Sequence, residues 1–542
     1  MTGAELFAAS LRVQGVEWVS TLCGNGLNDL LAACEGTGIR VVDTRNEQAA
    51  AYMADAWGKL SGRPGVCLVS SGVAHVNALG GVTNAWFDGA PMLLVSGAGP
   101  LRTAGLGHFQ DLDQVTLAAP VCKYARLIDS APRVAEFVHQ AFAAALHGRP
   151  GPAHLTFPMD VQAASAEGAE PWPRVVRVRG GRAAPELVER LAGLLAASRR
   201  PLIVCGSGAY HAGAEQALAQ FSAAFGVPVV VPIWDRGAIP AGMTEYVGVV
   251  GAATGDPALL GEADLVLLLG AEVDYRVGHL ASPPLRPGTP VVQIDADPAR
   301  LGRCLAPALE IGADPGALLT DLQEACMARR LEGFEEWLTE AKARREAFTR
   351  AVVDGASRGD GQVLHALDIL EVLERLLPAD AVLIVDGGNL GQWFHHTLGS
   401  RQYPGHWLTC GASAVIGFGL PAAMAARVGF PRRPVVVLSG DGSATFTVAE
   451  LERATGQGLP FVFIVADDER WGIVETGQAR RFGRPLNSLL GPVDFAGLAR
   501  ALGALGARGE NRAELEAALR QGLNERLPAV IHVPVVGGMP VA

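Results

Sequence analysis

One pattern recurs along the chain and constrains its fold more than any other feature. A short run of Val, Leu and Ile ends at Gly, Ser or Asp and is followed by a stretch with helical spacing, as at 66–72, 93–97, 202–206, 265–270, 382–387 and 435–440. Such continuous apolar runs are typical of strands buried on both faces, as in parallel sheets covered by helices. The pattern predicts an α/β fold built from doubly wound parallel sheets.

Two stretches lack this pattern and divide the chain. Residues 164–182 are rich in Pro, Gly and Arg, and residues 333–360 are charged, helical in spacing and without a strand signal. The blocks that remain each have the size of an ordinary domain. We therefore expect three domains, over residues 1–165, 184–330 and 360–542, with ligands bound beyond the carboxyl ends of the strands.

Composition excludes several classes of protein. Hydrophobic residues make up 49% of the chain, and the net charge is −11 without a long run of Lys or Arg. A globular protein is indicated, and nucleic acid or a membrane is not expected as a partner. No basic leader begins the chain, and no stretch approaches the ~20 apolar residues of a membrane helix. The eight cysteines lack zinc spacing, so we expect buried free thiols and a cytoplasmic protein.

The strongest chemical signal lies near the end of the chain. Gly440, Asp441, Gly442 and Ser443 follow one predicted strand, and Asp468 comes just after the next strand, 27 residues beyond Asp441. Two neighbouring strand ends thus present carboxylates to one point, with a helix beginning between them. A hard divalent cation prefers oxygen ligands and can bridge to a diphosphate, which the glycine N–H groups would bind. Asp467, next to Asp468, is the alternative second ligand.

With these motifs the chain resembles the thiamine diphosphate enzymes of the acetolactate synthase, benzoylformate decarboxylase and benzaldehyde lyase group. The resemblance covers essentially the whole chain. Besides 440–443, it rests on 44–50 (Thr-Arg-Asn-Glu-Gln-Ala-Ala), 65–72, 84–86 (Asn-Ala-Trp), 109–111 (Phe-Gln-Asp) and 411–421. It implies pyrimidine-binding, middle and diphosphate-binding domains, with thiamine diphosphate and Mg²⁺ as cofactors. It also implies active sites between two chains, hence a homodimer or homotetramer.

The resemblance assigns roles to individual residues. Glu47 would bond the pyrimidine ring of the cofactor and so help the thiazolium C2 to lose its proton, for which an apolar setting that raises the pKa is favourable. Gln110 would reach the reacting centre from the neighbouring subunit. Asp441, Asp468 and the backbone carbonyl of Arg470 would hold Mg²⁺. The implied cofactor-binding residues are Glu47, Gly387, Gly388, Asn389, Ala414, Ile416, Gly440, Gly442, Ser443 and Ile473.

The sequence departs from its relatives at several positions. The second metal ligand is usually Asn, and the extra charge of Asp468 beside a diphosphate should weaken binding. Glu272 precedes 273–277 where FAD-binding members carry Arg, so FAD is doubtful. Val474 stands where pyruvate-type decarboxylases have Glu, and Ser70 stands where benzoylformate decarboxylase has His. The polar and apolar candidates for the substrate pocket are Asn25, Ser70, His75, His108, Gln392 and Val474.

This pocket is poor in proton donors, which favours carbon–carbon cleavage and ligation of 2-keto acids, aldehydes or acyloins over decarboxylation with protonation. A 2-keto acid decarboxylase and a 2-hydroxyacyl-CoA lyase are alternatives, and Arg480, Arg481 and Arg484 would serve the latter. A nucleotide-binding oxidoreductase is suggested only by the glycine turn at 204–209, which lacks the third glycine and the later acid. A non-catalytic paralogue is disfavoured by Glu47 and Asp441. The pair 395–396 (His-His) is expected to be structural.

Overall fold

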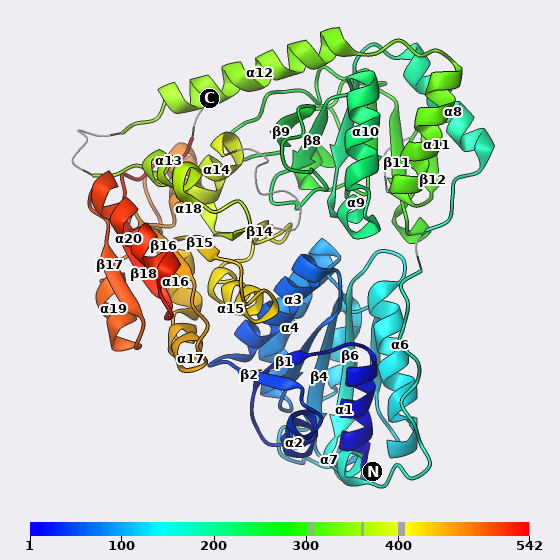
Figure 1. The fold of residues 1–542 in the computed structure, drawn as a ribbon, viewed down its shortest axis with the longest axis vertical. Helices are drawn as coiled ribbons and strands as arrows, with labels where there is room; N and C mark the ends of the chain where they lie inside the picture. The colour runs from blue at the N-terminus through cyan, green and yellow to red at the C-terminus, as the bar shows by residue number, and fades with distance from the viewer. Residues whose placement is uncertain (179, 304–306, 359–362, 399–406, 541–542) are drawn as a thin grey trace.

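The structure, a computed structural model, describes residues 1–178, 180–303, 307–358, 363–398 and 407–540. It contains three six-stranded sheets, and every strand pair in them is parallel. Figure 1 shows the first domain in blue and cyan, the middle domain in green and the last domain in yellow to red, each with helices on both faces of its sheet. The predicted α/β fold is confirmed, and each sheet lies within one predicted domain range.

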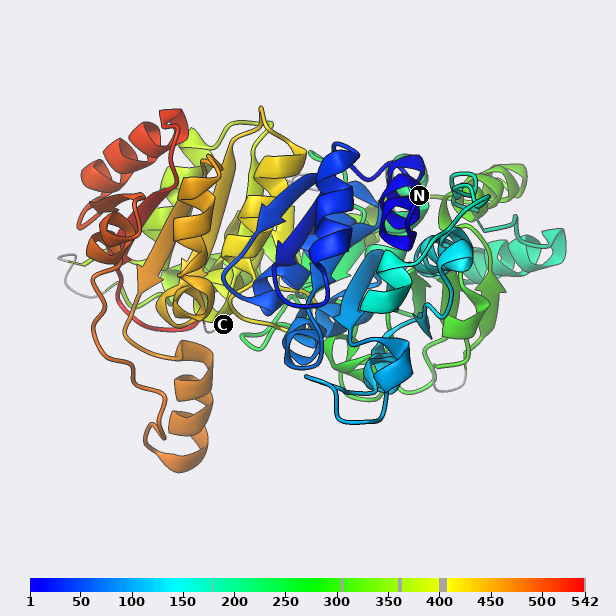
Figure 2. The same ribbon diagram turned by 90° about the horizontal axis from the view of Figure 1, so that it is seen from below.

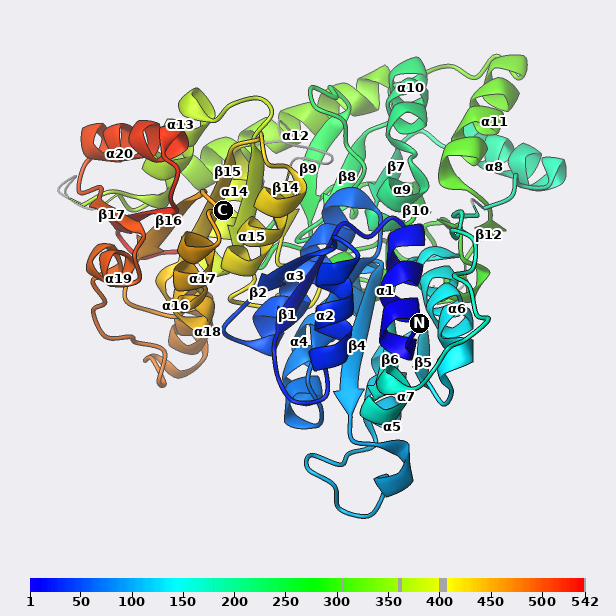
Figure 3. The ribbon, with the colours of Figure 1, turned by 60° about the horizontal axis from the view of Figure 1, so that its bottom comes forward.

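The first domain has the strand order β2-β1-β3-β4-β6-β5. Its strands are β1 (Trp18–Leu22), β2 (Arg40–Asp43), β3 (Gly65–Val69), β4 (Met92–Ala98), β5 (Tyr124–Leu127) and β6 (Pro152–Pro158). Its helices are α1 (Gly3–Val13), α2 (Asn28–Gly36), α3 (Glu47–Ser61), α4 (Val73–Asp88), α5 (Gln114–Ala118), α6 (Val134–Leu146) and α7 (Met159–Ala163). The loop between β4 and α5 projects from the body of the domain (Figure 3).

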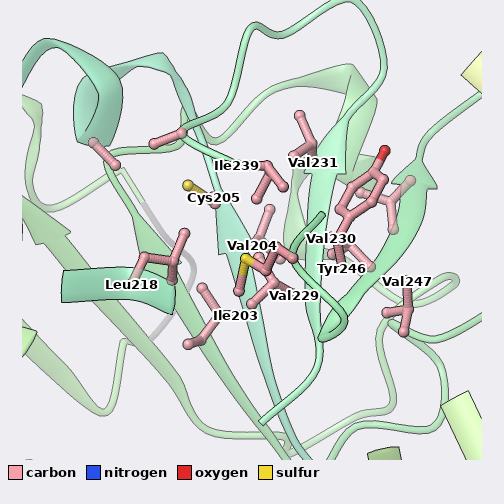
Figure 4. Close-up of a cluster of buried hydrophobic side chains, with 14 of the residues drawn as sticks. Ile203, Val204, Cys205, Leu218, Val229, Val230, Val231, Ile239, Tyr246 and Val247 are labelled. Atoms are coloured by element: carbon pink, nitrogen blue, oxygen red, sulfur yellow. The ribbon is translucent and has the colours of Figure 1, made fainter. Parts of the chain in front are cut away.

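The middle domain has the strand order β12-β11-β10-β7-β8-β9. Its strands are β7 (Pro201–Cys205), β8 (Val229–Pro232), β9 (Tyr246–Val250), β10 (Leu265–Leu269), β11 (Val291–Asp295) and β12 (Leu309–Gly312), and its helices are α8 (Pro185–Ala197), α9 (Ser207–Ala212), α10 (Glu215–Phe225) and α11 (Pro315–Ala328). Figure 4 shows its core, where Ile203 and Val229 of neighbouring strands lie near Leu218 of α10. Helix α8 turns one face to this core, with Leu191 and Leu195 buried.

The connector predicted at 333–360 contains one long helix, α12 (Glu335–Asp354), which runs along the middle domain to the last (Figure 1). The last domain has the strand order β14-β13-β15-β16-β18-β17. Its strands are β13 (Val382–Asp386), β14 (Trp407–Thr409), β15 (Val435–Gly440), β16 (Val462–Asp467), β17 (Leu505–Arg508) and β18 (Ala529–Pro534). Its helices are α13 (Ala366–Leu376), α14 (Gly388–Thr397), α15 (Gly419–Gly429), α16 (Asp441–Thr447), α17 (Glu450–Gly456), α18 (Gly472–Phe482), α19 (Phe495–Ala501) and α20 (Arg512–Asn524).

Other expectations about the chain concern its cysteines and membrane helices. Among the described cysteines none forms a disulfide; Cys23 is exposed and the other six are buried, while Cys304 lies outside the described residues. In the described ranges, no helix combines the length and the apolar character that crossing a bilayer requires.

Helix α3 packs against α15 of the last domain, and polar contacts hold it near both ends. Near its start, the backbone N–H of Arg45 donates to the buried Glu450 carboxylate, 3.0 Å from each oxygen. Near its end, Lys59 is only 5% exposed, and its Nζ lies 2.9 Å from Asp55 Oδ2 and 2.6 Å from Asp88 Oδ2. Since buried charges are tolerated only when paired, these three side chains form one unit, the Lys59 cluster.

The Lys59 cluster fixes the turn at 411–414 in the last domain. Asp88 accepts a hydrogen bond from the N–H of Ala412 at 2.8 Å, and Asn84 links Asp55 to the Ser413 hydroxyl. A Cβ on Gly411 would lie 1.8 Å from Asp88 Oδ2, so only glycine allows this approach. The first domain therefore sets the position of a segment that the sequence assigns to the cofactor site.

Replacing Lys59 by Met should lower the free energy of unfolding by about 3–5 kcal/mol, because two carboxylates then remain buried without a cation. The measurement is chemical denaturation followed by circular dichroism at neutral pH. Burial already raises the pKa of Asp55 to about 6, so part of the loss should return in mild acid as that carboxyl takes up a proton.

The matched control is Lys342→Met on α12, a side chain for which the structure shows no ion pair within the described ranges. This change should shift the free energy of unfolding by less than about 0.5 kcal/mol. Equal losses in the two variants would show that the Lys59 cluster contributes nothing specific.

Candidate functional site

A cavity of about 530 Å³ opens at the carboxyl edge of the last-domain sheet and extends to the middle domain. It brings together the predicted residues of the last domain. These are Gly387, Gly388, Asn389, Gln392, Ala414, Ile416, Gly440, Asp441, Gly442, Ser443, Asp468, Arg470, Ile473 and Val474. They come from four separate segments, which parallel pairing of β14, β13, β15 and β16 places side by side.

The two carboxylates at the strand ends lie in an environment suited to a cation. Burial, together with the negative charge of Asp468, raises the pKa of Asp441 to about 7. Burial also raises the pKa of Asp468 to about 6. Asp467, the alternative ligand, is instead engaged by His532, whose Nε2 lies 2.8 Å from its Oδ2. The geometry therefore favours Asp468 over Asp467 as the partner of Asp441.

A third oxygen is available next to these carboxylates. Hydrogen bonds flank Arg470 on both sides, from Leu490 to Glu469 and from Trp471 to Ser488, and within the described ranges none uses the Arg470 carbonyl. The same ranges contain no group of three or more His, Cys, Asp or Glu side chains arranged for a metal. A cation here would thus have two carboxylates and one carbonyl from the protein, and would need further oxygens from a bound anion.

The neighbouring wall offers unused donors. Helix α14 begins at Gly388, after Gly387 with a φ of 92°, so its first N–H groups face the cavity. Both polar side-chain atoms of Asn389 are buried without a partner among the described residues. A Cβ on Gly442 would lie 2.4 Å from the Trp471 ring, so the backbone is closely packed there. Orphaned polar atoms beside a glycine-rich backbone fit a diphosphate.

The turn at 411–414 forms another part of the wall. Ala414 has a φ of 52°, and Ile416 follows it into the cavity lining. The turn is held from the first domain by the Lys59 cluster and from the middle domain by Tyr275, whose hydroxyl donates to the Ala412 carbonyl at 3.0 Å. Asp386 accepts from the Gly419 N–H at 2.9 Å and fixes the following helix. Residues of all three domains therefore hold the turn that is expected at the bend of the cofactor.

Sequence reasoning missed the contribution of the middle domain and of the C-terminal segment. Further residues lining the cavity are Ile233, Trp234, Gly251, Ala253, Tyr275, Trp393, Trp471, Val535, Val536 and Gly538. Trp234 lies two residues beyond the end of β8, so the rule that ligands bind beyond strand ends would have pointed to this segment. Its φ of 64° and its contact with α14 have no signal in the sequence.

The predicted residues of the first domain form a separate group at the carboxyl edge of their own sheet. Glu47, the first residue of α3, accepts a hydrogen bond from Asn77 at 3.0 Å. Gln110, with a φ of 55°, bonds the Ser71 hydroxyl at 3.0 Å. The Ser70 hydroxyl donates to the Asn25 carbonyl. None of the cavity-lining residues comes from this domain, so a single chain assembles two half-sites.

Two histidines proposed for the substrate pocket differ in their placement. His75 is fully buried in the first-domain core, where its Nδ1 lies 2.8 Å from Ser96 Oγ and its ring packs against His154. The prediction that it lies in the substrate pocket is therefore corrected: His75 was a candidate as a polar residue near the expected site, but in the first turn of α4 its side chain is buried. His108 is half-buried against Gly99, in the projecting loop.

Three secondary predictions concern residues outside the site. His395 and His396 are buried in the last domain, and burial lowers the pKa of His395 to about 3, in agreement with a structural pair. The glycine turn after β7 packs against 270–271, where a Cβ on Gly206 would lie 2.4 Å from Ala271 Cα. This close packing supports the turn as a structural one. Arg480, Arg481 and Arg484 are exposed and do not line the cavity.

Comparison with known proteins agrees with this geometry. Residues 1–117 match the N-terminal TPP binding domain of the thiamine pyrophosphate enzymes, residues 188–322 match their central domain, and residues 386–533 match their C-terminal TPP binding domain. The chain is 30% identical over 537 residues to the acetolactate synthase large subunit IlvG of Mycobacterium tuberculosis, covering 98% of this chain and 95% of that one. The chain belongs to the thiamine pyrophosphate enzyme family.

Thiamine pyrophosphate is another name for thiamine diphosphate, so the family resemblance is confirmed. Acetolactate synthase isozyme 2 large subunit of Escherichia coli is 30% identical over 540 residues, covering 99% of this chain and 96% of that one. A probable 2-ketoarginine decarboxylase, AruI of Pseudomonas aeruginosa, is 30% identical over 531 residues, covering 97% and 92%. The unpaired Asn389, the paired acids and the glycine backbone fit the cofactor of this family.

The buried histidines give the thiamine pyrophosphate enzyme a pH-dependent stability. Burial lowers the pKa of His75 to about 4 and that of His154 well below its usual value near 6.5. Between these values the unfolded chain binds more protons than the folded one, so stability falls as the pH drops below about 6.5. We expect each histidine to account for about 2 kcal/mol between neutral pH and pH ~5.

His154→Phe keeps the ring and removes its titration, so urea unfolding of this variant should lose about 2 kcal/mol less than the wild type over the same pH interval. An equal loss in both proteins would mean that His154 becomes protonated without unfolding.

Proposed function

We propose that this chain is a thiamine diphosphate- and Mg²⁺-dependent carboligase or lyase that acts on 2-keto acids or acyloins, as the names of its acetolactate synthase relatives suggest. The observation that carries the proposal is the single cavity in which Asn389, Asp441 and Asp468 meet beside Ile416. When bound, thiamine diphosphate supplies a carbanion equivalent that adds to a carbonyl carbon.

The residues of the chain have distinct tasks in this proposal. Asp441, Asp468 and the Arg470 carbonyl hold Mg²⁺, and the N–H groups after Gly387 and Gly442 bind the diphosphate. Ile416 would support the bend of the cofactor, and the Ala414 carbonyl would accept from its amine. Glu47 would share a proton with the pyrimidine ring nitrogen, and Gln110 would contact the reacting centre.

The two half-sites of one chain support a site shared between two copies. The loop that carries Gln110 exposes Leu106, Phe109 and Leu112, with 77%, 61% and 46% of their surfaces accessible. Helix α18 projects from the last domain (Figure 2), and Val474 and Phe482 on it are 52% and 53% exposed. Apolar groups gathered on projecting elements mark protein contacts. In a homodimer or homotetramer, the first domain of one copy would cover the cavity of another. The exposed apolar side chains of the loop and of α18 would then both be buried.

The lining favours carbon–carbon bond transfer over protonation. Val474 occupies a position on the cavity wall where a carboxylic acid would serve as proton donor, and the nearby walls are aromatic or aliphatic. The probable 2-ketoarginine decarboxylase relative makes 2-keto acid decarboxylation the second candidate. A 2-hydroxyacyl-CoA lyase has less support, because its three arginines lie outside the cavity. We place the enzyme in the cytoplasm.

Product analysis tests the proposed reaction class. A panel of 2-keto acids, each with and without an added aldehyde, should yield 2-hydroxy ketones or 2-hydroxy-3-keto acids as the main products; free aldehydes as the sole products would favour the decarboxylase. Glu47→Gln should abolish turnover and slow C2–H exchange of the bound cofactor by more than about 100-fold, since general acid–base groups contribute this much. Exchange is followed by NMR in D₂O, with the exposed Glu167→Gln as control.

Mixing two inactive variants tests the shared site. In a mixed dimer of Glu47→Gln and Asp441→Ala chains, one of the two sites receives an unaltered Glu47 from one chain and an unaltered Asp441 from the other. Co-refolded chains should therefore recover up to about a quarter of the wild-type activity by random pairing. No recovery, with dimers present in sedimentation, would place both groups of one chain in the same site.

Substitution of the carboxylates tests the metal. Asp441→Ala removes one oxygen ligand and should weaken thiamine diphosphate binding in the presence of Mg²⁺ by tenfold or more, about 1.4 kcal/mol. Asp468→Asn should instead tighten it several-fold, because an oxygen ligand is kept and a negative charge beside the diphosphate is removed. Isothermal titration calorimetry of thiamine diphosphate, with Mg²⁺ and with EDTA, measures the affinity of both variants. Tightening by Asp467→Asn in place of Asp468→Asn would assign the ligand to Asp467.

A further inference from the structure

One polar side chain on the cavity wall has an orientation fixed by two others. The Thr254 hydroxyl, from the loop after β9, lies 2.9 Å from Gln392 Oε1 and 2.7 Å from His396 Nε2. All three residues are buried, and Gln392 and His396 lie one turn apart on α14. Gln392 lines the cavity, whereas Thr254 and His396 lie behind it.

The hydrogen atoms available in this group of side chains determine whether Gln392 offers a donor or an acceptor to a ligand in the cavity. The Thr254 hydroxyl has one hydrogen, and it donates this to Gln392 Oε1. His396 must then donate its Nε2–H to Thr254 Oγ1, which a neutral ring does in one tautomer; burial keeps this ring neutral by lowering its pKa to about 4. In the described part of the chain, no hydrogen bond uses Gln392 Nε2. Its N–H groups are therefore the free donors at this wall.

Close packing around α14 holds the Gln392 amide in place, and the charged residues that line the cavity lie at its other end. A Cβ on Gly391 would lie 2.6 Å from the Trp234 ring, so α14 and Trp234 are in close contact. Trp234 packs edge-on against His395, and Trp393 Nε1 donates to the Gly538 carbonyl. The charged residues lining the cavity are Asp441, Asp468 and Arg470, all at its diphosphate end, among the described residues. Gln392 lies one helical turn beyond Asn389, about 5 Å along the axis.

The uncharged wall and the free N–H groups of Gln392 determine which kind of chemical group can bind there. A carboxylate brought to a neutral amide between tryptophans would be buried without a cation, at a cost of several kcal/mol. A purely aliphatic chain would leave the Nε2–H groups unpaired, which is also costly. A neutral oxygen acceptor, such as a ketone, amide or ether, satisfies the donor without introducing charge.

We propose that Gln392, oriented by Thr254 and His396, is a specificity-determining residue that donates a hydrogen bond to a neutral oxygen on the side chain of the substrate. The inference rests on the proposed function, because it takes the substrate to be a 2-keto acid or aldehyde. It adds that the substrate carries an uncharged acceptor beyond its reacting carbonyl group.

The test compares paired substrates. Each pair consists of a straight-chain 2-keto acid and the analogue in which one methylene is replaced by a ketone carbonyl, at several chain lengths. For at least one length, the wild type should prefer the carbonyl analogue by about tenfold in kcat/KM, and Gln392→Met should remove this preference, because sites that bond a polar group discriminate strongly. Thr254→Val removes the hydroxyl that orients Gln392 and should reduce the preference. Thr254→Ser keeps the hydroxyl and should show the wild-type preference.

Controls separate specificity from folding and from cofactor binding. Gln521→Met, on the exposed face of α20, should keep the wild-type preference. Thiamine diphosphate affinity by titration calorimetry should be unchanged in Gln392→Met, and a loss of affinity would reassign Gln392 to the cofactor. A wild type that turns over the pairs without preference, or a Gln392→Met variant that keeps it, overturns this inference alone. Absence of turnover of every 2-keto acid and aldehyde overturns the proposed function instead.

Discussion

The parallel pairing of β13, β15 and β16 is the constraint on which the site depends. The register pairs Asp386 with Ser439 and Gly440 with Ala466, so three strands end at one level of the same edge. The segments that follow them start at this level, so their side chains and N–H groups converge, with Gly387 packed closely on Ser443 and Gly442 packed closely on Trp471. Since the interiors of these strands are apolar and fully covered, a shift in register would bury polar ends and expose core residues. The packing of the core and the geometry of the site are therefore enforced together.

Buried charge connects this edge to the other domains. The Lys59 cluster and the Glu450 carboxylate lie between the first and last domains, where desolvation makes unpaired groups costly. Tyr275 and Thr254 extend the middle domain to the same cavity. Apolar contact alone would allow the domains to slide, whereas directed hydrogen bonds to one turn and one helix define their positions.

Much of the fold and of the candidate site was predictable from the sequence, and different residues were predictable for different reasons. The strands and the cluster around Asp441 and Asp468 follow from local patterns: apolar runs, and acids at strand ends. The wall formed by Trp234 and the C-terminal segment was not predictable, because it depends on how domains dock and on a left-handed backbone at a tryptophan. His75 was misplaced because its residue type and its position near the expected site do not specify which neighbouring elements cover it. The contact that engages Asp467 comes from His532, which is distant in sequence.

Helix α3 has an unusual mechanical position. It spans 15 residues, about 22 Å, with Glu47 at its first residue and Lys59 in its last turn. Near its start the chain is held to the last domain by Glu450, and near its end by the Lys59 cluster. One continuous helix thus connects Glu47 to the cluster that holds the 411–414 turn, so the spacing between these two parts of the chain follows from helical geometry.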